Sequence, residues 1–482
     1  MRHEFEAVVI GAGFSGIGMA IRLRQAGLKD FAVLEQADDL GGTWRDHTYP
    51  GCTADVPADL YSYSFAPNPN WSSLYPPQTE IRDYLASCAR RFGVLDHIRY
   101  RTRMVSARFD DSTHTWTVHT GSGEEYVSRF LILAVGVLRT PVLPDLHRFG
   151  GPAFHTAQWN HDCDLDGKRV AVIGTGASAI QIVPEIAPRA DALYLFQRTP
   201  PWVLPRYSRA RPRWQRRLYA RLPLLQRLAR GLQFAVLEAL GPVNYLQPRL
   251  GGPIEAIARR LLRRSVHDPR LHDALTPRYR IGCKRILLSN RYLPALNLPH
   301  VHVVTEPITQ VGRSGITTGD GREHSVDVII AATGYDPYGD FQRLDITGSG
   351  GHTLAEVWNK GLTAHLGVTV SGFPNLFFLI GPHSGTGHTS VMLMAEAQMR
   401  YILRCLQLVH RARVASIEVR AGVQDRFTAR MLGLSARTVW LTGGCRSWYL
   451  DQPGSSRGLW PSSTLSFQLR TRRARRAEHQ LR

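Results

Sequence analysis

A short apolar run near the start of the chain is followed by a glycine-rich turn and then by a helical pattern. Residues 7–10 have the uninterrupted apolar character of a buried parallel strand, and residues 11–16 form the turn G-A-G-F-S-G. The pattern then predicts a helix over about residues 15–26 and a second buried strand at residues 31–35. This order is typical of the first half of a dinucleotide-binding domain.

The same order occurs a second time in the middle of the chain. Residues 169–173 predict a strand, residues 174–179 a second glycine-rich turn, and residues 193–196 the next strand. Two further apolar strands, within residues 130–136 and 327–336, each run into a glycine turn. We therefore expect an α/β protein with two Rossmann-like dinucleotide-binding domains.

Residues 206–280 differ from this pattern and predict a helical insertion. Within it, apolar residues recur at helical spacing with arginines between them. The apolar positions are Trp214, Leu218, Leu222, Leu225 and Leu228, and the arginines are Arg216, Arg217, Arg221 and Arg227. We expect this amphipathic helix to pack on the nucleotide domain rather than to contact a membrane, the alternative that its basic face leaves open.

Length and composition limit the classes of protein to which the chain can belong. A length of 482 residues corresponds to roughly three domains, and 43% hydrophobic residues are enough for buried cores. The excess of 59 Lys and Arg over 39 Asp and Glu first suggests a polyanionic partner, but nearly all of it is arginine. Because the sequence contains no recognisable DNA- or RNA-binding module, we expect no nucleic-acid partner. Residues 471–482 form a basic tail, and we expect the arginine-rich stretch at residues 470–476 to be solvated and mobile.

The cysteines, the first predicted strand and the apolar stretches indicate the cellular compartment in which we expect the protein. Six scattered cysteines without a C-x-x-C pair exclude a zinc ribbon and argue against a disulfide framework, and no cluster has the spacing of metal ligands. The first predicted strand leaves no room for a secretory signal. The most apolar long stretch, residues 222–246, is interrupted by Pro223 and by charges and cannot be an uninterrupted membrane span. We therefore expect a cytoplasmic protein without a metal.

The first glycine-rich turn and the residues after it predict a flavin site. Glycines let the backbone approach a pyrophosphate at the start of a helix, and an acid about twenty residues later accepts hydrogen bonds from ribose hydroxyls. A Gly-Gly segment follows, and the whole resembles the FAD-binding half of two-dinucleotide flavoproteins. The residues expected to bind FAD are Gly11, Gly13, Gly16, Glu35, Gly42, Thr43 and Trp44.

The second turn predicts a different nucleotide. Where the first unit has Glu35, the second has Gln197 followed by Arg198. A carboxylate would repel a ribose 2′-phosphate, whereas a guanidinium pairs with it, so this site favours NADPH over NADH. The residues expected to bind NADPH here are Gly174, Gly176, Ser178, Arg198 and Thr199.

A third motif lies between the two turns and has the form F-x-G-x-x-x-H-x-x-x-W. It is carried by Phe149, Gly151, His155 and Trp159. Together with the two turns it resembles the fingerprint of the type I Baeyer–Villiger monooxygenases, although Asn160 stands where the family usually has Pro or Asp. The resemblance implies an FAD-dependent, NADPH-consuming enzyme that uses O2 and a C4a-peroxyflavin to insert oxygen beside the carbonyl of a small hydrophobic ketone.

The resemblance also assigns roles to residues outside the turns. It implies that Asp55 is the active-site acid beside the cofactor, that Arg285 is the catalytic arginine, and that Lys284 holds the NADPH 2′-phosphate. It implies that Trp448 closes over the nicotinamide, and we interpret His155 as a pivot between domains. A guanidinium suits the catalytic position on physical grounds, because it stays charged and can face both a peroxide anion and a developing alkoxide.

These interpretations define an order of domains. We expect FAD-binding parts at residues 1–148 and 339–470, NADPH-binding parts at residues 149–205 and 281–338, and the helical insertion between the latter two. An N- or S-oxygenating flavin monooxygenase is the alternative within enzymes; a disulfide reductase fits less well, because Trp44 stands where its first redox cysteine would fall. A catalytically silent flavoprotein that senses or binds is the alternative of another class. The ketone and the oligomeric state are left open.

Overall fold

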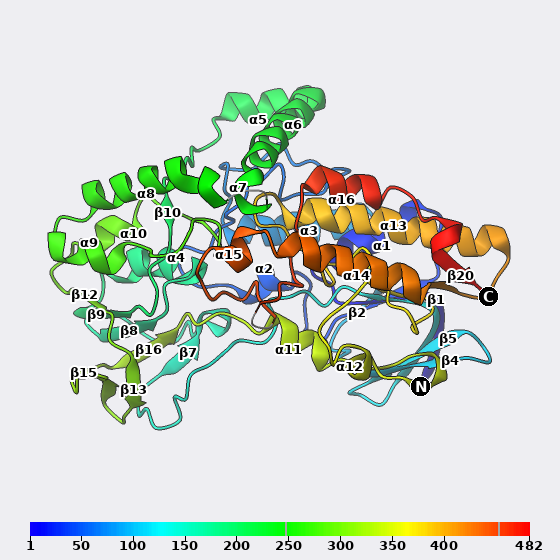
Figure 1. Ribbon diagram of the computed structural model, residues 1–482, viewed down its shortest axis with the longest axis horizontal. Coiled ribbons are helices and arrows are strands. Elements are labelled where there is room, and N and C mark those ends of the chain that lie inside the picture. The colour runs from blue at the N-terminus through cyan, green and yellow to red at the C-terminus, as the bar shows by residue number, and fades with distance from the viewer. Residues whose placement is uncertain (246–247, 452–453) are drawn as a thin grey trace.

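Two sheets, each flanked by helices, form the two halves of the molecule: the first is mixed, with β5 antiparallel to its neighbours, and the second is parallel (Figure 1). The computed structural model describes residues 1–245, 248–451 and 454–482. The first sheet has the order β17-β4-β5-β6-β1-β2-β3, and β18 pairs with the second half of β6. Its strands are β1 (Arg2–Ile10), β2 (Phe31–Leu34), β3 (Ile98–Arg99), β4 (Met104–Asp110), β5 (Thr115–Thr120), β6 (Glu125–Leu133), β17 (Asp345–Thr347) and β18 (Leu376–Phe378).

The second sheet has the order β12-β9-β8-β16-β7 and is parallel throughout. Its strands are β7 (Ala153–His155), β8 (Arg169–Ile173), β9 (Ala192–Phe196), β12 (Val301–Val304) and β16 (Val328–Ala331). Smaller sheets are formed by β10 (Val203–Leu204) with β11 (Leu287–Leu288), and by β13 (Ile308–Val311), β14 (Gly315–Thr318) and β15 (Glu323–Ser325). The α/β class and the two Rossmann-like domains are confirmed.

Helices cover both sheets and connect their strands. The helices of the first half are α1 (Phe14–Gln25), α2 (Thr43–Asp46), α3 (Gln78–Arg91), α11 (Pro337–Gln342), α12 (Leu354–Val357), α13 (Val391–Ala412), α14 (Ala421–Ser435), α15 (Val439–Thr442) and α16 (Thr464–Arg470). The second half has α4 (Ala177–Ile186) and α10 (Tyr292–Ala295). Short 3-10 turns occur along the whole chain, at Leu95–His97, Thr156–Gln158, Pro248–Gly251, Ser349–Gly351 and Arg476–Glu478. The long helix α13 packs on α1 beside the first sheet, because its apolar residues fall on one face.

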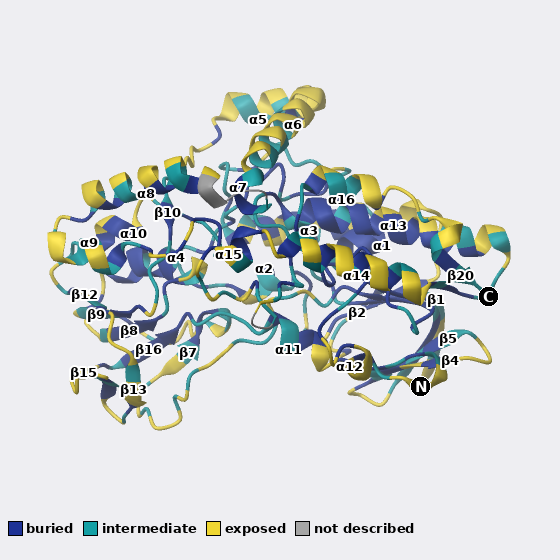
Figure 2. Ribbon diagram, viewed as in Figure 1, coloured by how far each residue is buried: buried dark blue, intermediate teal, exposed yellow. Residues whose placement is uncertain are grey.

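The insertion is helical, as expected, but its apolar face is turned to the solvent and not to the body of the protein. It contains α5 (Arg213–Arg221), α6 (Pro223–Leu240), α7 (Pro242–Tyr245), α8 (Gly252–Ser265) and α9 (Pro269–Leu275). The residues expected to pack on the nucleotide domain are exposed: Trp214 by 67%, Leu222 by 51% and Leu228 by 61% (Figure 2). The expectation of a buried apolar face was therefore wrong. Within the described ranges, no helix is both long and apolar enough to cross a membrane.

The C-terminal segment is held more closely than a mobile tail. Its arginines are exposed, but β20 (His479–Leu481) pairs antiparallel with β19 (Ile417–Val419). His479 is buried, and its Nε2 is 3.0 Å from the hydroxyl of Tyr401 on α13. The pairing with a strand about sixty residues earlier holds the residues after the arginine-rich stretch, and it has no local signal in the sequence.

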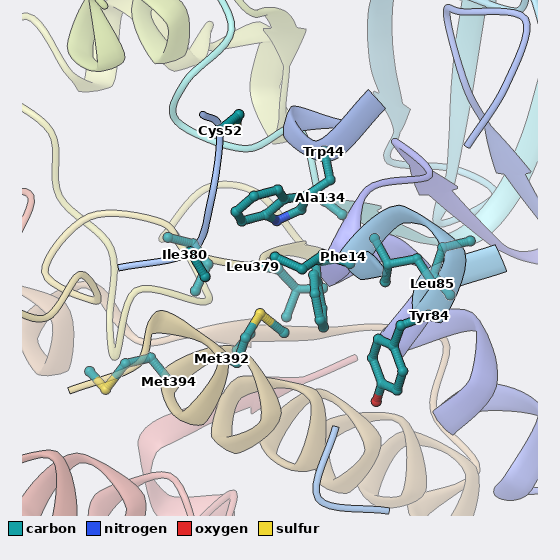
Figure 3. Close-up of a cluster of buried hydrophobic side chains, with 14 of the residues drawn as sticks. Phe14, Trp44, Cys52, Tyr84, Leu85, Ala134, Leu379, Ile380, Met392 and Met394 are labelled. Atoms are coloured by element: carbon teal, nitrogen blue, oxygen red, sulfur yellow. The ribbon is translucent and has the colours of Figure 1, made fainter. Parts of the chain in front are cut away.

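A large apolar core lies between α1, α13 and one face of the first sheet, and a second apolar cluster covers the other face. Figure 3 shows a part of the large core, where Phe14 from α1, Trp44 from α2, Ile380 from the segment after β18, and Met392 from α13 lie around one another. Trp44 is buried, and its backbone carbonyl accepts a hydrogen bond from the Gln78 side chain at the start of α3. The core therefore fixes the segment that follows the first glycine-rich turn.

Candidate active site and cofactor sites

The first glycine-rich turn connects β1 to α1, and its three glycines have different reasons to be glycine. At Gly11, whose φ is 102°, a Cβ atom would lie 2.7 Å from the carbonyl oxygen of Ala134, and at Gly16 it would lie 1.8 Å from that of Gly11. At Gly13 a Cβ would meet nothing nearer than Gly42, at 3.6 Å. Protein packing thus requires Gly11 and Gly16, while Gly13 leaves room at the N-terminus of α1, where a pyrophosphate fits.

Glu35 lies at the end of β2, beside this turn, and is 4% exposed. Its Oε2 accepts a hydrogen bond from the Ala12 N–H at 2.7 Å, and its Oε1 accepts from the Ala37 N–H at 3.0 Å and from Arg45 at 3.1 Å. A carboxylate has about four acceptor positions, so one stays available for a ribose hydroxyl. Glu35 therefore fits the predicted contact with a ribose hydroxyl and also holds the glycine-rich turn in place. Arg45, which was not expected from the sequence, holds Glu35 in turn.

The second glycine-rich turn repeats this geometry between β8 and α4. Gly174 has a φ of 110°, and a Cβ there would lie 2.5 Å from the carbonyl oxygen of Ala332. Around Gly176 no atom lies within 4 Å of an added Cβ, so this position is open to a ligand. The hydroxyl of Thr175 donates to the carbonyl oxygen of Thr199 at 2.9 Å and ties the turn to the segment after β9, and Ser178 lies in the first turn of α4.

Arg198 and Lys284 come together at this second site from distant parts of the chain. Arg198 is exposed, and Lys284 is half-buried with its Nζ 5.2 Å from the centre of the Tyr279 ring. Burial lowers the pKa of Lys284, and the charge of Arg198 lowers it further. Two neighbouring cations that repel each other are stabilised by an anion between them, and a ribose 2′-phosphate has this chemistry.

Asp55 and Arg285 form an ion pair between the two halves of the molecule. The Arg285 Nε donates to the Asp55 Oδ2 at 2.9 Å, and the two side chains are 27% and 35% exposed respectively. Burial opposes ionisation of Asp55, but the guanidinium outweighs it and lowers the pKa of the carboxyl group. The carboxylate in turn raises the pKa of Arg285 above its ordinary value. Each partner therefore favours the charged form of the other.

Three further residues surround this pair and were not named from the sequence. The Arg206 Nη2 donates to the Thr53 hydroxyl at 2.8 Å, beside Asp55, and burial lowers the pKa of Arg206. The Tyr61 hydroxyl accepts from the Trp44 indole at 3.1 Å, and burial raises the pKa of Tyr61 to about 12. Tyr449 is buried next to Arg285. Sequence signals existed for Tyr61, which lies in the aromatic segment after Asp55, and for Tyr449, which directly follows Trp448.

A disulfide joins the two segments that carry Arg285 and Trp448. Cys283 and Cys445 are bonded across 162 residues, with Cα atoms 6.1 Å apart. The expectation of no disulfide was therefore wrong; pairs so far apart in sequence cannot be recognised from spacing. Trp448, three residues after Cys445, is 46% exposed and stands edge-on to Tyr449, with ring centres 4.6 Å apart.

The third motif lies along the edge of the second sheet. Phe149 packs in the apolar cluster around Ile329, and at Gly151 a Cβ would lie 2.5 Å from the carbonyl oxygen of Asp327, which explains the glycine. Trp159 stands edge-on to Phe154 at 5.2 Å. The motif therefore holds the chain segment that enters the second sheet through β7.

His155 ends β7 at the seam between the halves. It is 1% exposed; its Nδ1 accepts from the Ala157 N–H at 3.1 Å, and burial lowers its pKa. Its ring stands edge-on to Tyr335, at 5.4 Å, and the Tyr335 hydroxyl is hydrogen-bonded to the Nε2 of His47. The contacts of His155 with Tyr335 and of Tyr335 with His47 thus lead from the second sheet, through the segment between β16 and α11, to the first half of the molecule.

Comparison with known proteins agrees with this geometry. The model of the family "Flavin-binding monooxygenase-like" matches residues 5–345. A Baeyer-Villiger monooxygenase of Pseudomonas aeruginosa is 44% identical over 97% of this chain and 89% of its own, and one of Streptomyces coelicolor is 44% identical over 99% and 93%.

Solved structures match over the whole chain as well. An oxidized steroid monooxygenase bound to NADP is 31% identical, with a TM-score of 0.87 and 97% of each chain covered. A closed structure of cyclohexanone monooxygenase is 26% identical, with a TM-score of 0.89 and 100% of each chain covered. The chain therefore belongs to the flavin-binding monooxygenase-like family and, within it, to the Baeyer–Villiger monooxygenases, which use FAD and NADPH.

Proposed function

We propose that this enzyme converts apolar ketones into esters or lactones, and that Arg285, held by Asp55, stabilises the negative charge that develops on oxygen during the insertion. The observation that carries this proposal is the 2.9 Å ion pair at the seam between the flavin half and the nicotinamide half. When bound, FAD reduced by NADPH supplies the activated oxygen. The protein supplies the charge, the orientation and the exclusion of water.

Asp55 acts on the guanidinium and not on the ketone. Its carboxylate engages the Nε of Arg285, so that the two Nη groups can reach other acceptors, one of which is the hydroxyl of Tyr449 beside the guanidinium. Because the pKa of Arg285 is raised by Asp55, the guanidinium keeps its proton and acts as a fixed electrostatic partner of the alkoxide that forms from the carbonyl. Arg206 adds a second positive charge nearby.

The nicotinamide side is organised by the residues next to Arg285. Lys284 and Arg198 offer paired cations for the 2′-phosphate, and the Cys283–Cys445 bond keeps the Trp448 loop against the same segment. We propose that binding of NADPH thereby sets the position of Arg285, because Lys284 and Arg285 are adjacent on one short segment before β11. His155 serves as the pivot between the two halves.

The test is oxygenation by the purified holoenzyme. The protein should carry one FAD, visible in its absorption spectrum, and oxidise NADPH faster when a cyclic or aryl ketone is added. Product analysis should give the ester or lactone in an amount close to the NADPH consumed. Oxygenation of amines and sulfides without any ester from ketones would replace this proposal with an N- or S-oxygenating monooxygenase.

A further inference from the structure

The helical hairpin of α5 and α6 is attached to the body through its polar side. Asp59, whose side chain is 1% exposed, accepts hydrogen bonds from Arg211, from Gln226 at 2.9 Å and from Gln233 at 3.0 Å. Arg230 of α6 donates to the backbone carbonyl of the same aspartate. Gln226 is the buried residue of α6. The inner face of this helix is therefore polar around Asp59, and farther along Phe234 and Leu237 pack against the small apolar cluster of Val56, Leu60 and Leu393.

The outer face of α6 is apolar. Leu225, Leu228, Leu232 and Val236 fall on one side of the helix, and they are exposed by 36%, 61%, 68% and 53%. Further exposed apolar side chains of the hairpin are Trp214, Leu218, Leu222, Leu224 and Leu240. A helix on the surface of a globular protein normally shows the opposite arrangement, with its apolar stripe toward the core. A contiguous apolar surface of this kind marks an interaction site.

The hairpin also carries a concentrated positive charge. Residues 206–240 contain nine arginines and one acidic residue, Glu238. Arg213, Arg217 and Arg221 are exposed and follow one another at four-residue intervals along α5, beside Trp214 and Leu218. Figure 1 shows α5 and α6 standing out from the body, and Figure 2 shows their outer surfaces exposed. The apolar and the basic side chains of the hairpin can therefore contact the same flat partner at the same time.

We propose that the α5–α6 hairpin docks this enzyme on a lipid bilayer that contains anionic phospholipids. The apolar stripe enters the boundary between headgroups and acyl chains, and the arginines contact the anionic headgroups. Exposed Trp214 fits the interface, where amphipathic rings are favoured. The net charge of +20 attracts the whole chain to such a surface. This docking does not depend on the reaction proposed above.

A second copy of the chain is the less suitable occupant of this surface. A two-fold symmetric contact would place the same patch on both subunits, and therefore the arginines of one hairpin against those of the other. Like charges at an interface oppose association. Anionic headgroups offer the complementary charge, and a bilayer accepts leucines without a matched pocket.

Vesicle flotation with the full-length, FAD-loaded protein tests the proposal. Vesicles of phosphatidylcholine with about one-quarter phosphatidylglycerol should carry the protein, and the bound fraction should fall as salt rises from about 0.05 M to about 0.5 M. Vesicles of pure phosphatidylcholine should bind it at least about tenfold more weakly. Equal binding to both kinds of vesicle would remove the anionic part of the proposal, and binding to neither would overturn it.

Two variants and one control separate the apolar and basic contributions. Leu228→Glu/Leu232→Glu should lower vesicle binding by about tenfold or more, because two charges enter the apolar face. Arg213→Gln/Arg217→Gln/Arg221→Gln should lower binding to anionic vesicles by about a hundredfold, since each arginine contributes roughly fivefold. Val105→Glu, at a position 55% exposed on β4, should bind as the wild type does. All three should oxidise NADPH at the wild-type rate without vesicles.

Other results decide against the proposal. Wild-type binding by both variants would show that another surface touches the lipid. A wild-type dimer in sedimentation analysis that the leucine variant converts to a monomer, with no vesicle binding, would make a second copy the occupant. If the leucine variant loses its flavin through misfolding, the arginine variant decides alone, because its three side chains are exposed on α5.

Discussion

The Nε of Arg285 lies 2.9 Å from the Oδ2 of Asp55, across 230 residues of chain. Asp55 follows α2 in the flavin half, and Arg285 precedes β11 in the nicotinamide half. The pair therefore forms only when the two halves have the right relative position. Since Arg285 is adjacent to Lys284, the cation that we propose for catalysis is coupled to the site that we propose for the 2′-phosphate.

Replacement of Arg285 should separate NADPH oxidation from product formation. In Arg285→Ala, ester formation should fall by about 10²–10³ or more, because the developing alkoxide loses its charged partner. Flavin reduction should continue in weakened form, and the oxygen consumed should appear as hydrogen peroxide. Rapid-reaction spectra combined with product and peroxide assays measure each quantity. Asp55→Ala should show the same pattern more mildly, since the charge remains without its orienting partner.

A near-wild-type ester yield from Arg285→Ala would remove this residue from the catalytic machinery. Arg291→Ala is the matched control, because Arg291 lies on the same segment but its side chain is exposed and pairs with Glu185. It should keep the wild-type ratio of ester to NADPH consumed.

Arg198 and Lys284 should decide the choice between NADPH and NADH. The wild type should prefer NADPH by about 10- to 150-fold, which corresponds to roughly 1–3 kcal/mol. Arg198→Ala and Lys284→Ala should each raise the KM for NADPH while changing the KM for NADH little, because NADH lacks the 2′-phosphate. Steady-state kinetics with both nucleotides give the comparison. An equal rise for both would place these side chains away from the phosphate.

The two open glycines should distinguish the two nucleotide sites. Gly13→Val should abolish FAD binding, and Gly176→Val should retain FAD but weaken NADPH binding. Neither position has a positive φ, and neither added Cβ meets protein atoms closer than 3.6 Å, so the fold should persist. Flavin content by absorbance and NADP⁺ binding by calorimetry measure the two effects. Gly433→Val, on α14, is the control and should retain both nucleotides.

The sequence predicted the strands, turns and glycines well because these depend on local patterns. The apolar runs at residues 7–10 and 169–173 become β1 and β8, and Gly11 and Gly174 take the positive φ that their turns need. The pairing of Asp55 with Arg285 could be expected only through the family resemblance, because no local rule brings together residues so far apart.

Three features lay beyond the sequence pattern. The spacing of Leu225 and Leu228 showed that α6 is amphipathic, but it did not show which face turns inward. The buried carboxylate of Asp59 binds the polar residues of α6 and so turns that face toward the body. The bond between Cys283 and Cys445 depends on tertiary proximity, and so does the pairing of β20 with β19. The disulfide and the strand pair each join segments that lie far apart in sequence, and the hydrophobic periodicity within one segment does not show which other segment it contacts.

His47 should make the protein less stable in mild acid. Burial lowers the pKa of His47 to about 4, against an ordinary value of 6.5. Between these two values the unfolded chain binds a proton that the folded protein does not, so stability falls as pH falls from about 6.5 toward 4 and then levels off. The full effect is about 3 kcal/mol. His47→Gln should lose this part of the pH dependence in urea unfolding, whereas His267→Gln, at an exposed position, should keep it.

The disulfide should stabilise the fold and the Trp448 loop together. Denatured, unreduced protein should show four reactive thiols, from Cys52, Cys88, Cys163 and Cys405, and reduced protein should show six. Cys283→Ser/Cys445→Ser should lower the free energy of unfolding by about 2–4 kcal/mol, because a closed loop of this length restricts the unfolded chain. It should also raise the KM for NADPH, since the loop loses its link to the Lys284 segment. Cys163→Ser should change neither quantity, and six thiols without reductant would show that the bond does not form.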